Sequence, residues 1–355
     1  MNRQLLDYYS DYLISQNQLA TATGLSALLD GEVSHDQVTR FLHADELDSK
    51  ALWRYVKPQV KRLSQTGDEG VLILDDTIEE KAYTDENEVV CWHYSHAKGR
   101  HVKGMNLLSC LVRYGEVALP IGYEVVKKDQ RYFDEATQRV KRQASVSKNE
   151  HFRALVLQAM NNGVAFDYIL ADNWFGAKAN MHFIHDELGK KFIFGIKSNR
   201  CVALTQTQQS RGQFQSVKSL DWKDGDCQVV YLKDISMPVK LLKKVFTNGD
   251  GSTGTLYLVS NDLTLEADRF YAVYQKRWRI EEFHKSMKQN VSLAKSPTKV
   301  MRSQLNHIFA SFIGFCKLEL LKVKTSMNHF AMKHKLVLKA NQAALKELRK
   351  LQPCA

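Results

Sequence analysis

Two stretches of this chain place aspartates directly after a run of apolar residues. The first run covers residues 71–74 and leads into Asp75 and Asp76, and the second covers residues 166–171 and leads into Asp172. Such runs predict buried strands that end at the acids, and ligand sites of open α/β sheets lie at the carboxyl ends of strands. Carboxylates are ligands that Mg²⁺ takes in proteins. Acids in this position are also common as helix caps or turn residues, and on the pattern alone a metal site is the less favoured explanation.

A third acid lies in a predicted helix over residues 265–288. Its polar residues at helical spacing are Tyr274, Arg277, Glu281 and Lys288. Steps of three, four and seven residues place all four on one helix face. On such a face Glu281 suits a metal ion, whereas Arg277 and Lys288 suit phosphate oxygens and Tyr274 suits a DNA backbone or base. A solvated helix with ion pairs between neighbouring turns is the alternative.

The spacing of these four residues, Y-x2-R-x3-E-x6-K, resembles the signature of the IS4-like transposases without a mismatch. Residues 74–77 and 171–176 are similar to that family's segments around its first and second acids. The β-rich stretch between the second and third acids is also typical of the group. These similarities span residues 71 to 288 in the expected order, and no motif aligns before residue 65 or beyond about residue 300.

The resemblance implies a DNA transposase that binds the terminal inverted repeats of its insertion sequence. It implies catalytic and metal-ligating roles for Asp76, Asp172 and Glu281 around two Mg²⁺ ions, for which Mn²⁺ substitutes. Phosphodiester hydrolysis and strand transfer would then use water and a freed 3′-hydroxyl as nucleophiles. Spacing alone does not distinguish Asp75 from Asp76, and Asp76 is preferred because it directly precedes Thr77, as in the family motif.

Further candidates for DNA contact lie outside the acids. Lys197 and Arg200 follow a predicted core strand and resemble the family's basic loop near bound DNA, with plain surface charge as the alternative. Trp174 and Trp222 are candidates for stacking on a flipped base, against the alternative of buried structural tryptophans.

The N-terminal region carries a helical pattern that Gly31 interrupts. Ser34 and Gln37 then form a capping-box pattern, which opens a short helix that exposes Arg40. This arrangement is compatible with a helix-turn-helix that binds DNA, and a plain helical bundle explains it equally well.

Strands that alternate with helices predict an α/β fold, with an RNase H-like core and a mixed sheet. We expect a helical N-terminal domain over residues 1–68, a core in two parts over 69–198 and 263–299, a β-rich insertion over 199–262, and a basic helical C-terminal region over 300–355. Within the core, helices are expected over residues 148–161 and 177–188.

The positive charge of the chain is concentrated near its end. Residues 271–355 carry 17 Lys and Arg against 4 Asp and Glu, whereas the other 270 residues carry 33 against 35. Such a block attracts a polyanion, since Lys and Arg release counterions from DNA. Double-stranded DNA, as transposon ends and target, is therefore the expected partner. A basic helix face that serves solubility alone is the alternative.

Several classes of protein find no support. The chain is 44% hydrophobic and 25% charged, which argues against wholesale disorder. It has no apolar stretch of about 18 residues and no signal-peptide pattern, so we expect a cytoplasmic, nucleoid-associated protein without a membrane partner. The six scattered cysteines indicate neither zinc nor a disulfide framework. No glycine-rich phosphate loop indicates a nucleotide cofactor.

Three other functions compete with a transposase, which by family behaviour would act as a homodimer on two DNA ends. A non-catalytic DNA-binding protein would share the charge and the fold, but the intact acids and the intact polar helix face argue against it. A junction-resolving nuclease of RNase H type would lack the β insertion. An unrelated basic α/β protein would need every motif segment to coincide by chance.

Overall fold

The computed structural model describes residues 2–44 and 47–351. The centre of the fold is a mixed sheet in the order β4-β3-β1-β7-β8. Its strands are β1 (Val71–Glu80), β3 (Arg100–Tyr114), β4 (Val117–Val125), β7 (Tyr168–Ala171) and β8 (Lys191–Ile196). β3 runs antiparallel to its neighbours β1 and β4, and β7 and β8 run parallel to β1. The predicted α/β class with a mixed sheet is confirmed, and the topology is consistent with an RNase H-like core.

β1 is the central strand, and it is longer than the apolar run predicts. Its residues 71–74 are fully buried. They pair with β7 over residues 71–73, whereas β3 pairs with β1 along its whole length. The prediction that the strand ends at the acids is wrong, because β3 supplies antiparallel partners as far as Glu80. Asp75 and Asp76 therefore lie inside β1, just past its last pair with β7.

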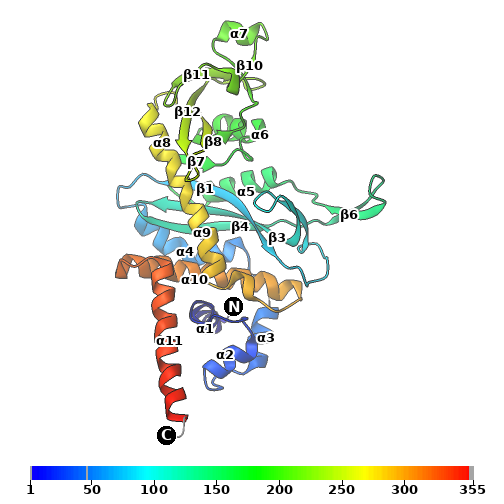
Figure 1. Cartoon of the computed structure of the whole chain (residues 1–355), viewed down its shortest axis with the longest axis vertical. Coiled ribbons are helices and arrows are strands. Elements are labelled where there is room, and N and C mark those ends of the chain that lie inside the picture. The colour runs from blue at the N-terminus through cyan, green and yellow to red at the C-terminus, as the bar shows by residue number, and fades with distance from the viewer. Residues whose placement is uncertain (1, 45–46, 352–355) are drawn as a thin grey trace.

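The predicted β-rich stretch forms five strands that extend the same sheet. These are β9 (Cys201–Ala203), β10 (Gln215–Ser216), β11 (Cys227–Leu232), β12 (Val239–Thr247) and β13 (Thr253–Ser260), with the short helix α7 (Gln206–Ser210) between β9 and β10. β13 pairs antiparallel with β8, which joins the inserted strands to the core (Figure 1). The limits of the predicted domains stay a prediction.

Three further strands have no counterpart in the sequence prediction. β2 (Cys91–Ser95) pairs with the first half of β3. β5 (Gln130–Asp134) and β6 (Arg139–Gln143) form a separate two-stranded hairpin. Figure 1 shows this hairpin projecting from the side of the sheet.

The core helices follow the predicted positions with two local changes. α5 (Lys148–Asn161) agrees with the prediction. The predicted helix over residues 177–188 divides into α6 (Lys178–His182) and a π-helical turn (Phe183–Glu187). The helix predicted over 265–288 consists of α8 (Ala267–Gln275), a 3-10 turn (Lys276–Trp278) and α9 (Arg279–Gln289).

Helices from the two ends of the chain pack together beneath the sheet. The N-terminal ones are α1 (Arg3–Ser15), α2 (Ala22–Leu28), α3 (His35–His43) and α4 (Ser49–Leu63), and the C-terminal ones are α10 (Met301–Thr325) and α11 (His329–Leu351). The Ser34–Gln37 capping box at the start of α3 is confirmed. α10 contacts β4 on one side and α1 and α3 on the other, and Figure 1 shows it lying between them.

α11 extends away from the body of the molecule (Figure 1), and its residues beyond Lys333 are almost all exposed. Within the described residues, none of the helices combines the length and the apolar character that a membrane crossing requires.

The packing of α10 predicts a large loss of stability when its buried aromatic residues are truncated. The Phe312 ring is fully buried and stacks on Tyr123 at 4.5 Å between ring centroids. We expect Phe312→Ala to lower the free energy of unfolding by about 3–5 kcal/mol, because the substitution leaves a cavity. Chemical denaturation measures the change. Leu321→Ala, on the same helix but 42% exposed, should change it far less, and equal effects would contradict this packing.

Candidate active site

An arginine on the helical side of the site joins two of the acids. The Arg277 Nη1 atom lies 3.2 Å from Asp75 Oδ2 on β1 and 3.4 Å from Glu281 Oε1 on α9. The contact brings together residues that are about 200 positions apart in the sequence. Asp75 and Arg277 are largely buried, whereas the Glu281 side chain is 42% exposed, so Glu281 has the most room to reorient.

Asp76 has different partners. Its carboxylate accepts hydrogen bonds from Lys148 Nζ at 3.0 Å and from Asn106 Nδ2 at 2.5 Å. Successive residues of a strand point to opposite faces, which explains why Asp75 contacts Arg277 while Asp76 contacts Lys148 at the start of α5. Asp75 is therefore the acid that contacts the polar helix face, although the family motif favours Asp76 as the metal ligand.

Asp172 follows β7 directly, as the sequence predicts. Its Oδ1 atom accepts a hydrogen bond of 2.9 Å from the backbone N–H of Trp174. Burial raises the pKa of both Asp75 and Asp172, and the charge of Asp172 adds to the shift of Asp75 as that of Asp76 adds to the shift of Asp172. The structure thus gathers Asp75, Asp76, Asp172 and Glu281 into one electrostatically coupled region.

Burial and the repulsion of neighbouring carboxylates oppose ionisation of Asp75 and Asp172. Burial, followed by the charge of Asp172, raises the pKa of Asp75 to about 8, although Arg277 acts in the opposite direction. Burial is also the largest cause of the raised pKa of Asp172. Carboxylates that are buried together favour a nearby positive charge, and here Arg277 and Lys148 supply it.

The polar helix face lies against the sheet and is not a solvated face. Lys288 Nζ donates to Thr77 Oγ1 at 2.9 Å and to the carbonyl of Ile78 at 3.1 Å, both on β1. Tyr274 is buried, and its ring centroid lies 5.7 Å from the Arg277 guanidinium carbon. Arg277 and Lys288 thus both contact protein groups on the side of the helix that faces the acids.

Two buried histidines, His93 and His284, flank Asp76. Burial lowers the pKa of His93 to about 4 and that of His284 to about 3, while the charge of Asp76 acts in the opposite direction on both. Both rings are therefore neutral near pH 7. Within the described residues neither Nε2 atom has a hydrogen-bond partner. The spacing of His284, three residues after Glu281 on the same helix, was a signal that could have identified it.

The other predicted DNA-contacting residues are distributed over the molecule. Lys197 and Arg40 are exposed, whereas Arg200 is partly buried. Trp174 is 45% exposed beside the acids, with Lys148 Nζ 4.5 Å from its ring centroid. Trp222 is buried in the hydrophobic core, which fits a structural tryptophan. Arg40 instead lines a hollow with Gln37 and Phe41, and none of the four acids lines that hollow.

The donor chemistry of the site fits a hard divalent cation, since carboxylate oxygens are the ligands that Mg²⁺ and Mn²⁺ favour. In the present side-chain arrangement, the described residues contain no group of three or more His, Cys, Asp or Glu positioned to hold a metal ion. The Arg277 guanidinium stands between Asp75 and Glu281, which is one reason. A metal site formed by these acids requires Glu281 to move away from Arg277.

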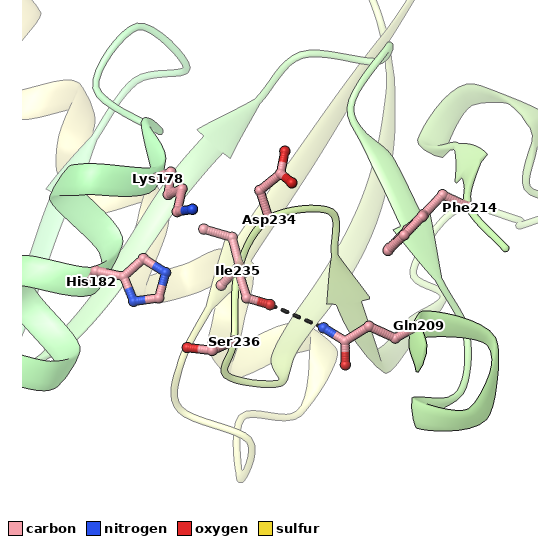
Figure 2. Close-up of a pocket in the computed structure, with 7 residues that line it drawn as sticks. All are labelled: Lys178, His182, Gln209, Phe214, Asp234, Ile235 and Ser236. Atoms are coloured by element: carbon pink, nitrogen blue, oxygen red, sulfur yellow. Dashed lines mark hydrogen bonds between the residues drawn. The ribbon is translucent and has the colours of Figure 1, made fainter. Parts of the chain in front are cut away.

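A separate hollow lies between α6 and the inserted strands. It has a volume of about 560 Å³ and is lined by Lys178, His182, Gln209, Phe214, Asp234, Ile235 and Ser236. Figure 2 shows Gln209 closing one side through a 3.0 Å hydrogen bond to the carbonyl of Ile235. None of the four coupled acids lines it, so it is not part of the carboxylate site.

The raised pKa of Asp75 predicts how stability changes with pH in metal-free buffer. The folded protein keeps a proton on Asp75 up to about pH 8, whereas the unfolded chain releases it near pH 4. The free energy of unfolding therefore decreases as the pH rises from about 4 to about 8. Asp75→Asn removes this dependence. The unfolding temperature of the variant, relative to that of the wild type, should therefore rise by on the order of 2–4 °C from pH 5 to pH 8.

Thermal unfolding at both pH values measures the difference. Asp85→Asn, at an exposed carboxylate, serves as the control and should follow the wild type. Identical pH dependence in Asp75→Asn and the wild type would show that the Asp75 carboxyl is ionised throughout.

Comparison with known protein families agrees with this geometry. A family described as a DDE superfamily endonuclease matches residues 1–215, and one described as a transposase DDE domain matches residues 136–314. No curated protein matches the chain. The two matches together span the sheet, the acids and the polar helix face. The chain belongs to the DDE superfamily of transposases and endonucleases, and it is a metal-dependent enzyme that cleaves DNA.

Proposed function

We propose that the chain is an IS4-like transposase that binds the terminal inverted repeats of its insertion sequence and carries out phosphodiester hydrolysis and strand transfer at their ends. The observation that carries this proposal is the convergence of acids from β1, the end of β7 and α9 on one electrostatically coupled cluster, in which Asp75 and Asp172 are largely buried. A cluster of this kind favours bound cations. The matching spacing of the polar helix face supports the IS4-like assignment.

In this proposal Asp76, Asp172 and Glu281 hold two divalent ions, Mg²⁺ with Mn²⁺ as a substitute. When bound, such ions activate the attacking water or 3′-hydroxyl and stabilise the leaving oxygen. Glu281 turns from Arg277 toward the other acids, which its partial exposure allows. The guanidinium of Arg277 then becomes available to a DNA phosphate, to which it donates two parallel hydrogen bonds.

Asp75 has a positioning role in the same scheme. Its contact with Arg277 keeps the guanidinium beside the carboxylates when Glu281 moves. Asp76 is the better ligand because its present cation, Lys148, is the end of a long, partly exposed side chain at the start of α5. Lys148 can withdraw without disturbing the sheet, whereas Arg277 is largely buried and lies against Tyr274.

Double-stranded DNA would contact surfaces on both sides of the site. Tyr274 on α8 and Lys288 on α9 would border the cleaved DNA strand. Lys197 and Arg200, which follow β8, would contact the DNA backbone. Arg40 on α3 would contact DNA farther away, and Trp174 is the better of the two base-stacking candidates because Trp222 is buried. We further propose that two copies of the chain act together as a homodimer on a pair of ends, as the family resemblance implies.

Removal of the helix carboxylate tests the catalytic assignment. Wild type and Glu281→Ala are incubated with DNA that carries the ends of the element and with Mg²⁺ or Mn²⁺, and cleaved strands are quantified. We expect the variant to lose on the order of 10³-fold or more in rate, because it loses several kcal/mol of transition-state stabilisation. End binding, measured by gel shift, should change little.

Glu282→Ala is the matched control, since Glu282 is the next residue of the same helix and pairs with Arg279 instead. It should cut like the wild type. Cleavage that persists in Glu281→Ala would exclude Glu281 as a ligand. If every protein binds the ends and none cuts them with either metal, the chain is a non-catalytic DNA-binding protein.

A second pair of variants distinguishes the adjacent aspartates. We expect Asp76→Asn to abolish both Mn²⁺ binding, followed by calorimetry, and cleavage. Asp75→Asn should keep its Mn²⁺ affinity within about threefold but cut more slowly, because Arg277 loses its anchor. The reverse pattern would assign the metal to Asp75.

A further inference from the structure

A second surface that carries suitable chemistry lies beside the acids. A cleft of about 710 Å³ lies between the start of the β2–β3 pair and the projecting β5–β6 hairpin. Its lining includes the aromatic residues Trp92 and Tyr132 and the basic residues Lys128, Arg139 and Arg142. Neither the metal site nor the polar helix face uses any of these residues.

The aromatic rings are presented to solvent. Trp92 is 52% exposed and Tyr132 is 41% exposed. On β2 the neighbours Cys91 and His93 are buried while Trp92 and Tyr94 are exposed, so the strand turns its apolar rings outward in alternation. A strand that packed only against its own sheet would leave polar side chains on that outer face.

The exposed aromatic surface continues from β2 toward the acids. The Tyr94 ring lies 5.3 Å from His101 across the β2–β3 pair and 4.9 Å from His96 in the connecting turn. The His96 ring lies 6.1 Å from Trp174, which follows Asp172 by two residues. Aromatic rings therefore lead from β2, where Trp92 lines the cleft, to the second acid.

Cations line the opposite side of the cleft. Its lining carries four Lys and Arg side chains against one carboxylate, that of Glu86, among the described residues. Lys128 Nζ donates to the carbonyl of Trp92 at 2.7 Å, and Arg142 donates to the carbonyl of Lys128 at 3.3 Å. These bonds hold the base of the hairpin beside β2 and keep positive charge next to the exposed indole.

One residue links this surface with the acids. Lys148 binds Asp76 through Nζ and also lies over the Trp174 ring. Burial lowers the pKa of Lys128 first, and the charge of Lys148 lowers it further, so the two ammonium groups are close enough to repel one another. Lys148 therefore lies near the cations of the cleft as well as beside Asp76.

Flat aromatic faces beside cations suit an unpaired nucleic-acid strand. Bases that are not paired stack on exposed rings, and the phosphates between them bind Lys and Arg. In duplex DNA the base faces are already stacked, so a duplex would use the cations alone. The exposed rings of Trp92 and Tyr132 therefore favour an unpaired strand.

We propose that the cleft between β2 and the β5–β6 hairpin binds an unpaired stretch of the DNA substrate next to the cleavage site. Bases stack on Trp92 and Tyr132, and phosphates bind Lys128, Arg139 and Arg142. The inference rests on the proposed function in that DNA is the substrate, but it concerns a surface outside the carboxylate site.

The test is a pair of affinities measured by fluorescence anisotropy in EDTA, which prevents cleavage. The probes are a labelled ten-nucleotide oligo-dT and a labelled duplex of the same length, and the proteins are the wild type and the Trp92→Ala/Tyr132→Ala double variant. We expect the double variant to bind the oligo-dT at least about tenfold more weakly. Its affinity for the duplex should stay within about threefold of the wild type.

Tyr83→Ala is the matched control, because Tyr83 is 94% exposed and does not line the cleft. It should leave both affinities unchanged. Tyr132→Ala alone, on the projecting hairpin, should show a smaller loss with the same selectivity, which keeps the test valid if the double variant folds poorly.

The proposal is overturned if the aromatic variants bind oligo-dT like the wild type. It is also overturned if they lose oligo-dT and duplex affinity equally, which would mark the cleft as a duplex-binding surface. Cleavage of element ends by the wild type is scored separately. If the wild type cuts the element ends but the cleft variants bind oligo-dT normally, the proposed function stands and only the cleft proposal fails. If the wild type binds oligo-dT selectively through the cleft but does not cut the ends, only the proposed function fails.

Discussion

The mutual repulsion of buried carboxylates is the constraint on which the rest of this structure depends. Asp75, Asp76 and Asp172 come from two parallel strands, and burial of uncompensated charge costs several kcal/mol per ion. Arg277 and Lys148 offset that cost from the two helical sides of β1. The same two contacts therefore hold α9 and α5 against the sheet and keep positive charge beside the acids.

The sheet and the helices below it make that arrangement rigid. β7 stops at Ala171, and its pairing with β1 ends at Ile73, so the acids emerge where β1 no longer has a parallel neighbour. Lys288 joins α9 to β1 through hydrogen bonds. Phe283, also on α9, packs against Phe312 of α10 with 5.6 Å between the ring centroids. The helices from both chain ends thus brace the helix that carries Glu281, far from any direct contact with the acids.

Local sequence patterns predicted the features that local forces determine. The apolar runs, the capping box at Ser34 and the helical spacing from Tyr274 to Lys288 each depend on neighbours within a few residues. The length of β1 did not follow from such a pattern, because its second half exists only through pairing with β3. Lys148 and Asn106 were missed for the same reason, since each meets Asp76 only after the chain has folded. The β5–β6 hairpin is largely polar and exposed, so no buried face produced an alternating signal.

Lys148 connects the two halves of the proposed mechanism in physical terms. Its ammonium group now stabilises Asp76 and covers one face of Trp174. Divalent ions at the acids would supply the charge that Asp76 needs and would repel Lys148, which would then turn toward DNA phosphates. That movement would also uncover the indole of Trp174, at the end of the aromatic surface that begins in the cleft. Metal binding would therefore leave the Trp174 ring open to a base of the unpaired strand, because it would draw Lys148 away from both Asp76 and the indole.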